Sequence, residues 1–117
     1  MGGEYPERGE IYLVDFGKVE GAQIEKTRPA LVIQNDLGNR HSPHTIVVAI
    51  RSAEEKKLLP VFVSVPEGIA GLTKNSLIDC GHISTILKAR LSNRIGKLPF
   101  SLQTEVDKAL KISLDLP

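Results

Sequence analysis

The chain has 117 residues, a formal net charge of +1, and apolar and charged fractions of 41% and 25%. These values are ordinary for a single globular domain, and they exclude wholesale disorder, a collagen-like chain and a coiled coil. Because the net charge is small, a nucleic-acid or membrane partner has to be recognised by a local patch. No apolar run approaches the roughly 18 residues that a membrane helix needs. The single cysteine, Cys80, has no partner for an internal disulfide, which favours a reducing cytoplasm.

Residues 10–97 predict short strands. A polar segment, residues 1–8, is expected to be loose. Beyond it, alternating or β-branched apolar runs are separated by glycine, proline and polar residues, which is typical of strands and their connections. Residues 17–27 are expected to form a long loop and residues 35–44 a turn or a longer excursion of the chain. The predicted strands are Glu10–Phe16, Ala30–Gln34, Thr45–Ile50, Val61–Val65, Ser76–Cys80 and Leu91–Lys97.

The end of the chain changes period and predicts a helix, for which Ser101 is the expected cap. Several short strands followed by one helix predict a mainly β protein, a small and strongly bent antiparallel β-barrel. Edge strands that are apolar on both faces would also suit a dimer. The apolar residues at helical spacing are Leu102, Val106, Ala109, Leu110 and Leu114.

Arg28 lies between the polar loop and a buried strand, and Pro29 forces extended backbone at this position. Its guanidinium has the planar fork that suits phosphate oxygens. From spacing alone, the simpler interpretation is a surface arginine paired with Glu25 or Asp36.

Arg51 and Ser52 follow the clearest predicted strand. A cation beside a hydroxyl is able to hold a phosphate, although spacing alone favours an ordinary solvated strand end. His82 and Ser84 follow the fifth strand, and a histidine can move protons near neutral pH. Most histidines, however, are only hydrogen-bonded structural residues.

Other reactive residue types give weaker signals. His41 and His44 have a spacing that two metal ligands can use, but they lie in a proline-containing loop without an obvious third ligand, so no metal site is predicted. Cys80 is expected to be a small core residue rather than a nucleophile. The sequence has no phosphate-binding glycine motif.

A series of segments is similar to one family over residues 8–116. The most specific is Val32–Asn39, followed by Ser42-Pro43 and Ile46–Ile50. The other similar segments are Arg8–Asp15, Gly21–Gln23, Thr27–Pro29, Cys80–Thr85, Lys88–Leu91 and Val106–Leu110. Together, these segments resemble the MazF/PemK-type toxins of bacterial toxin–antitoxin pairs.

This resemblance implies an SH3-like barrel of the MazF/Kid/CcdB type that forms a cytoplasmic homodimer. It also implies an endoribonuclease that needs no metal or other cofactor and cleaves single-stranded RNA, chiefly mRNA, at short sequences. In that reaction the ribose 2′-hydroxyl attacks the adjacent phosphorus and leaves 2′,3′-cyclic phosphate and 5′-hydroxyl ends. The implied protein partner is a cognate antitoxin.

The resemblance also implies roles for individual residues. Arg28 matches the family's arginine before proline, which stabilises transition-state charge. The family's threonine at the end of the third strand falls on Arg51, with a hydroxyl one place further on. Either Ser52 takes that role through a one-residue bulge, or Arg51 holds the phosphate by charge; we expect Ser52 to supply the hydroxyl. Residues expected to contact RNA are Gln23, Arg51, Lys56, His82 and Ser84.

The sequence departs from the family at two further places. Gln23-Ile24 stands where many members have Glu-Gln, and Gly81–Thr85 stands where many have acid-Gln-x-Arg-Thr. These departures leave open a catalytically silent relative that binds RNA or an antitoxin. A gyrase-binding toxin of the same fold is a further alternative, but Arg28-Pro29 and Gln34–Asp36 favour the RNA-cleaving branch.

Overall fold

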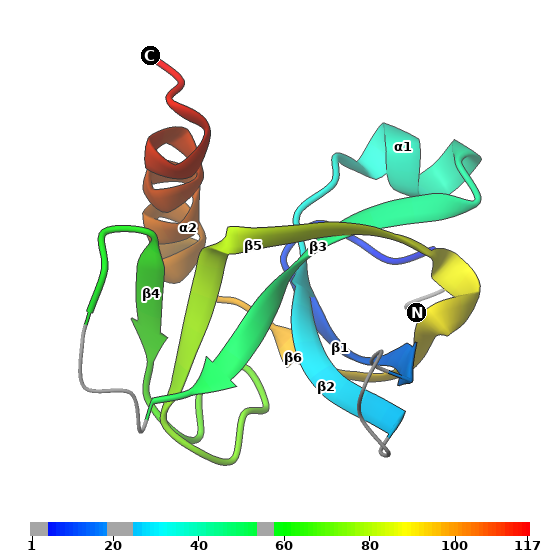
Figure 1. Ribbon diagram of the computed structural model, residues 1–117, viewed down its shortest axis with the longest axis horizontal. Coiled ribbons are helices and arrows are strands. Elements are labelled where there is room, and N and C mark those ends of the chain that lie inside the picture. Colours follow the sequence, from blue (N-terminus) through cyan, green and yellow to red (C-terminus); the bar gives the residue numbers. More distant parts are fainter. Residues whose placement is uncertain (1–4, 19–24, 54–57) are drawn as a thin grey trace.

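The computed structural model describes residues 5–18, 25–53 and 58–117. Within them the chain forms one antiparallel sheet with the strand order β4-β5-β3-β2-β1-β6, accompanied by a short and a longer helix (Figure 1). None of the helices in these ranges is long and apolar enough to cross a membrane. The elements are β1 (Glu10–Lys18), β2 (Glu25–Val32), α1 (Asp36–His41), β3 (His44–Ser52), β4 (Phe62–Val65), β5 (Ser76–Leu87), the 3₁₀ turn η1 (Lys88–Arg90), β6 (Leu91–Lys97) and α2 (Phe100–Leu114).

The prediction of a mainly β protein with a C-terminal helix is confirmed, and each of the six predicted strands overlaps an observed one. β1 and β2 extend into both ends of the expected loop, and the residues between them, 19–24, lie outside the described ranges. The connection expected at residues 35–44 is an excursion that contains the short helix α1, which the sequence analysis did not predict. Asn35 accounts for that helix, because its side chain caps the first turn by accepting a hydrogen bond from the N–H of Gly38 at 2.7 Å.

Ser101 is not the cap of α2. The helix begins one residue earlier, at Phe100, and its N-cap is Pro99, which makes no side-chain capping bond. Proline lacks an N–H and fixes φ near the helical value, so it suits the start of a helix without a capping side chain. The predicted apolar face is correct at its centre, where Val106, Ala109 and Leu110 are buried.

A bend in β5 makes the sheet curl. In its pairing with β3, Val48 lies opposite Ile83 but the next residue, Ala49, lies opposite Asp79. Cys80–His82 are therefore extra on β5, and the strand changes direction there (Figure 1).

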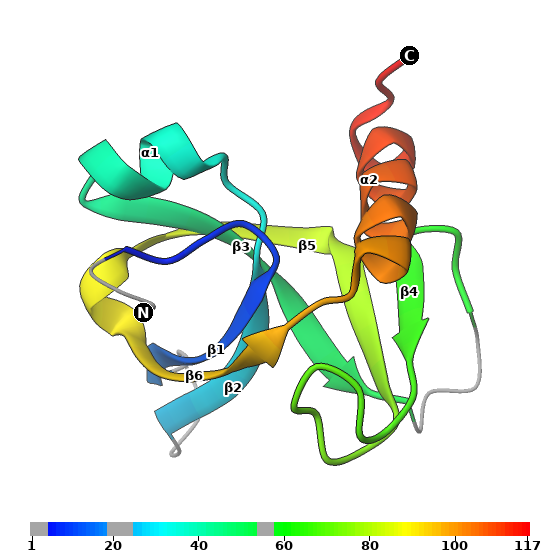
Figure 2. The ribbon, with the colours of Figure 1, turned by 180° about the vertical axis from the view of Figure 1, so that it is seen from behind.

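Two apolar clusters fill the curled sheet. The larger lies under α2, which covers β4 and β5, as the view from behind also shows (Figure 2). The smaller lies toward η1 and includes Val14 and Ile86. Val14 and Ile11 are both fully buried but belong to different clusters, which confirms that β1 is apolar on both faces.

The loop of residues 66–75 brings the two edges of the sheet together. The strand order leaves β4 and β6 at the edges, and this loop lies against β6. A Cβ on Gly71, where φ is +80°, would lie 2.3 Å from the carbonyl oxygen of Ile95, and a Cβ on Gly96 would lie 2.3 Å from that of Ala70. Only glycine permits so close an approach of two backbones. The sheet thus has the curl expected of a small barrel, with a loop contact rather than a described strand pairing between its edges.

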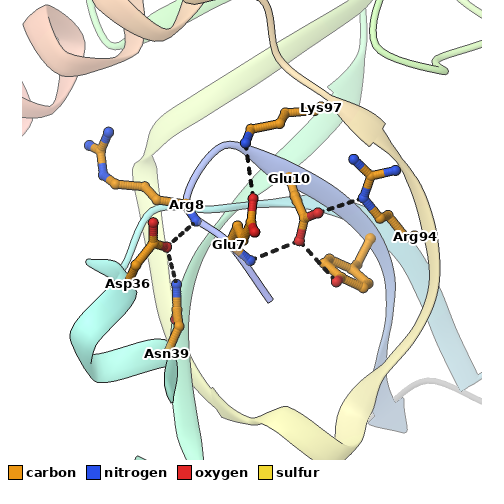
Figure 3. A network of polar contacts seen from close by, with 8 residues as sticks. Glu7, Arg8, Glu10, Asp36, Asn39, Arg94 and Lys97 are labelled. Carbon is orange, nitrogen blue, oxygen red and sulfur yellow. Dashed lines mark hydrogen bonds and ion pairs between the residues drawn. The ribbon is translucent and has the colours of Figure 1, made fainter. Parts of the chain in front are cut away.

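A buried carboxylate holds the start of β1. Glu10 is 2% exposed and accepts hydrogen bonds from the backbone N–H of Glu7 at 2.7 Å and the hydroxyl of Tyr12 at 3.0 Å. It also forms an ion pair with Arg94 on β6 (Figure 3). Burial, together with the hydrogen bond to Glu10, raises the pKa of Tyr12 to about 12.

Arg8 ties the same segment to three other parts of the chain. Its backbone N–H donates to the carboxylate of Asp36 at 2.7 Å (Figure 3). Its guanidinium donates to the carbonyl of Ile33 at 2.9 Å and to the carboxylate of Asp107 on α2 at 2.8 Å. The segment expected to be loose is therefore anchored at residues 7 and 8, while residues 1–4 lie outside the described ranges.

Candidate active site

A groove of about 440 Å³ opens between the twisted β2–β3 surface and the loop of residues 66–75. We call it the arginine groove. Its walls are apolar, and Leu13, Pro29, Ile50, Leu72 and Ile95 contribute to them. Its charged and hydroxyl-bearing residues are Arg28, Arg51, Ser52, Thr73, Lys74 and Ser76.

Arg28 lines this groove from the middle of β2, where it pairs with Val14 of β1. Its side chain is exposed. Of its two expected partners, Asp36 instead accepts hydrogen bonds from Arg8 and from the side chain of Asn39. The predicted Arg28–Asp36 pair is therefore wrong. The side chain of Glu25, the other expected partner, is not among those that the structure describes.

Arg51 and Ser52 line the arginine groove from the end of β3. Their pairing with β5 is regular, since Ala49 to Ser52 lie opposite Asp79 to Ser76 in unbroken register. The one-residue bulge expected here is therefore wrong, because the extra residues are on β5. Both side chains still border the groove, where β3 ends.

A second groove of about 400 Å³ adjoins the first, and we call it the histidine groove. Arg51 lines both grooves. Its Nε lies 3.2 Å from Oδ2 of Asp79, whose side chain is only 9% exposed. The lining residues are Arg51, Leu59, Val61, Phe62, Asp79, Gly81 and His82.

The remaining predicted RNA contacts are distributed differently. His82 is exposed and borders the histidine groove. Ser84, further along β5, lies opposite Val47 of β3 and lines neither groove. Gln23 and Lys56 fall in segments outside the described residues. The structure thus brings Arg28, Arg51 and Ser52 together and places His82 beside them.

Sequence reasoning missed four polar residues of these grooves, one of which is Ser76 at the start of β5. Thr73 and Lys74 line the arginine groove from a segment interpreted only as a glycine-bearing connection. Asp79 lines the histidine groove from the predicted strand Ser76–Cys80. A carboxylate inside an otherwise apolar strand was the available signal, because such a group needs a partner when buried.

The other reactive residues are either buried or line neither groove. Cys80 is fully buried, and burial, with a smaller contribution from Asp79, raises the pKa of its thiol to about 11, so it remains protonated. His41 ends α1 and His44 begins β3, both exposed. Among the described residues, no three side chains of His, Cys, Asp or Glu are grouped as metal ligands would be.

Cations from three elements surround the arginine groove, namely Arg28 on β2, Arg51 on β3 and Lys74 in the loop. Hydroxyls of Ser52 and Thr73 lie among them. This combination suits an extended anionic chain whose successive phosphates each need a cation or a hydrogen-bond donor.

The chain belongs to the PemK-like, MazF-like toxins of type II toxin–antitoxin systems, whose family profile matches residues 7–114. Among its relatives, Endoribonuclease EndoA of Bacillus subtilis (strain 168) is 42% identical over 109 residues, which cover 93% of this chain and 94% of that protein. Endoribonuclease MazF of Staphylococcus epidermidis is 40% identical, with 93% and 91% covered.

Solved structures show the same fold at lower identity. One is an endoribonuclease in complex with its cognate antitoxin from Mycobacterial species, with a TM-score of 0.80, 24% identity, and 96% and 97% of the two chains covered. Another is MazE–MazF (Form-II) from Deinococcus radiodurans, with a TM-score of 0.80, 20% identity, and 98% and 100% covered. The SH3-like toxin architecture expected from the sequence is thereby supported.

Proposed function

We propose that this protein is an endoribonuclease toxin that cleaves single-stranded RNA in the arginine groove. The observation that carries the proposal is that Arg28 of β2 and Arg51 and Ser52 of β3 border one groove. Two relatives that are 42% and 40% identical over nearly the whole chain are named endoribonucleases.

The reaction needs no nucleophile from the protein. The ribose 2′-oxygen attacks the adjacent phosphorus, the P–O5′ bond breaks, and the proton lost by the 2′-hydroxyl is balanced by one gained at the 5′-oxygen. The products are a 2′,3′-cyclic phosphate and a 5′-hydroxyl. The protein has to hold the two oxygens in line, help to move the protons and stabilise the extra negative charge on the phosphorane. We propose that it does so without a metal ion.

The residues of the groove fit these tasks. The guanidinium of Arg28 stabilises the charge that develops on the phosphoryl oxygens, and the hydroxyl of Ser52 donates a hydrogen bond to them. Arg51 contacts the same phosphate or its neighbour, and Lys74 neutralises a phosphate further along the chain. His82 contacts a nucleotide in the adjoining groove.

We further propose that an antitoxin with an acidic segment occupies the arginine groove and excludes RNA. The support is the family itself, which consists of toxins of toxin–antitoxin systems, and the cluster of Arg28, Arg51 and Lys74. A similar fold has been solved as an endoribonuclease in complex with its cognate antitoxin. The cytoplasm, where mRNA is found, is the proposed location.

A homodimer is proposed as the working form. The support is the membership of the MazF/PemK toxin family, for which the resemblance implies a homodimer, and an antiparallel sheet whose edge strands β4 and β6 can each meet a second copy. Light scattering on the purified protein tests this, and a mass near 25.6 kDa, twice the 12.8 kDa of one chain, is the expected result.

A silent RNA- or antitoxin-binding relative is the second candidate. Two observations favour it: an arginine, Arg51, occupies the position where the family has its threonine, and Gly81 stands where many members have a carboxylate. Such a protein would bind RNA in the same groove without cutting it.

One experiment separates the two candidates. A long mixed-sequence single-stranded RNA is incubated with the protein in excess EDTA, and the new ends are mapped. Discrete cuts with 5′-hydroxyl ends and cyclic phosphates are expected, and an RNA with 2′-deoxyribose at the cut site should bind but stay intact. Intact RNA that is nevertheless bound would establish the silent relative, while cuts with 5′-phosphate ends would contradict the proposed chemistry.

A further inference from the structure

Arg51 stands where the arginine and histidine grooves meet, because its side chain lines both. It is 42% exposed, and its only described ion-pair partner is Asp79. A long arginine side chain at the end of a strand loses considerable rotamer freedom when it is fixed in one orientation. A contact that fixes it before RNA arrives therefore favours binding and reaction.

Asp79 is well placed to supply that contact. Its Oδ2 lies 3.2 Å from Nε of Arg51, and its side chain is 9% exposed. Its other oxygen, Oδ1, accepts a hydrogen bond from the backbone N–H of Gly81 at 2.9 Å. The residue is also fixed between two neighbouring strands, since it pairs with Ala49 of β3 and Phe62 of β4.

The local backbone allows this arrangement. Asp79 comes directly before the bend of β5, and a Cβ on Gly81 would lie 3.2 Å from Oδ1 and 3.4 Å from a methyl group of Val61. A side chain at position 81 would thus crowd the carboxylate. A buried carboxylate is stable only when donors or cations satisfy it, and here the Gly81 N–H donates a hydrogen bond while Arg51 supplies the cation.

We propose that Asp79 is a positioning residue for RNA cleavage, whose carboxylate holds the guanidinium of Arg51 at the junction of the two grooves. This inference rests on the proposed function. The described contact uses Nε, and arginine has four further N–H groups on its two terminal nitrogens. Those groups are left for the phosphate oxygens of an RNA that passes from one groove to the other. Asp79 itself does not touch the reacting atoms.

The test is a double-mutant cycle on single-turnover cleavage, with the protein in saturating excess over RNA, for Asp79→Asn, Arg51→Gln and the double variant. Asparagine keeps an oxygen for the Gly81 N–H and removes the charge that holds Arg51. We expect Asp79→Asn to slow cleavage about tenfold, Arg51→Gln to slow it at least as much, and the double variant to be no slower than Arg51→Gln. Losses that multiply, or unchanged cleavage by folded Asp79→Asn, would overturn the proposal.

Two controls make the result specific. Asp107 lies on α2, outside both grooves, and its carboxylate pairs with Arg8 at 2.8 Å. Asp107→Asn removes this carboxylate and should leave cleavage unchanged. Circular dichroism establishes that each variant is folded. If Asp79→Asn does not fold, Arg51→Gln, at an exposed position, still tests the proposal. Unchanged cleavage by Arg51→Gln would show that the guanidinium that Asp79 is proposed to position is not needed, and would overturn the proposal.

Failure of the proposed function would look different. If the wild-type protein cleaves no RNA, the same three variants are compared by their Kd for a single-stranded RNA, which stays intact in that case. A positioning role then requires that both single variants and the double variant weaken binding to a similar extent. Independent, multiplying losses of affinity would overturn it.

Discussion

Replacing Gly71 with alanine tests whether the loop of residues 66–75 shapes the active groove by lying against β6. Gly71 has φ of +80°, and a Cβ there would lie 2.3 Å from the carbonyl oxygen of Ile95. Gly68, in the same loop, has φ of +88° but nothing within 4 Å of the position of its Cβ. The two glycines therefore separate backbone strain from steric clash.

The expected magnitudes follow from these distances. A left-handed conformation costs a residue other than glycine roughly 1–2 kcal/mol, which both variants incur. Gly71→Ala adds the cost of forcing two backbones apart, about 1–3 kcal/mol by analogy with overpacked cores. For a domain of this size, 1 kcal/mol corresponds to a change in Tm of about 4 °C. Gly68→Ala should thus lower Tm by about 4–8 °C and Gly71→Ala by about 8–20 °C.

Thermal unfolding followed by circular dichroism measures the difference, and RNA cleavage is assayed well below both transitions. Because Gly71 and the three residues after it line the arginine groove, Gly71→Ala should also cleave more slowly than Gly68→Ala. Equal values of Tm for the two variants would refute the reasoning, since the clash would then contribute nothing.

Three further predictions concern stability, pH and the site. Glu10→Ala removes a buried carboxylate that accepts hydrogen bonds from the Glu7 N–H and from the half-buried Tyr12 hydroxyl, and should lower the free energy of unfolding in urea by about 1–3 kcal/mol; a loss below about 0.5 kcal/mol would contradict this. The pKa of Cys80 is raised from 9.0 to about 11, so its neutral thiol stabilises the fold fully below pH 9 and loses this effect as pH rises to 11. Urea titrations should therefore show a shallower alkaline decline for Cys80→Ala than for wild type. Ser52→Ala should reduce RNA cleavage more than His41→Ala, and the reverse order would remove Ser52 from the site.

The strands and the terminal helix were predictable because their patterns are local. Thr45–Ile50 is a β-branched run, and α2 shows regular helical spacing. The second half of β5 was not predictable, because residues 81–85 are exposed or only partly buried there and carry no apolar alternation. Strand pairing with β3, rather than local preference, extends this strand to Leu87.

The candidate site was predictable through the resemblance to the MazF/PemK-type toxins. Spacing alone favoured ordinary surface residues at Arg28, Arg51 and Ser52, and the match to the family gave them their expected roles. Asp79 was missed because its role depends on Arg51, a residue 28 positions earlier that β3–β5 pairing brings within ion-pair distance. Burial of Glu10 was missed for the same reason, since its partner Arg94 lies on β6.

The central claim is that the arginine groove is where RNA is cleaved, and Arg28→Ala tests it most directly. Cleavage of a mixed-sequence RNA is measured in EDTA beside Arg40→Ala, which removes an exposed arginine of α1 outside both grooves. Loss of one preorganised donor to the phosphorane should slow Arg28→Ala by about two to three orders of magnitude, with Arg40→Ala unchanged. Cleavage by folded Arg28→Ala at nearly the wild-type rate would contradict the account.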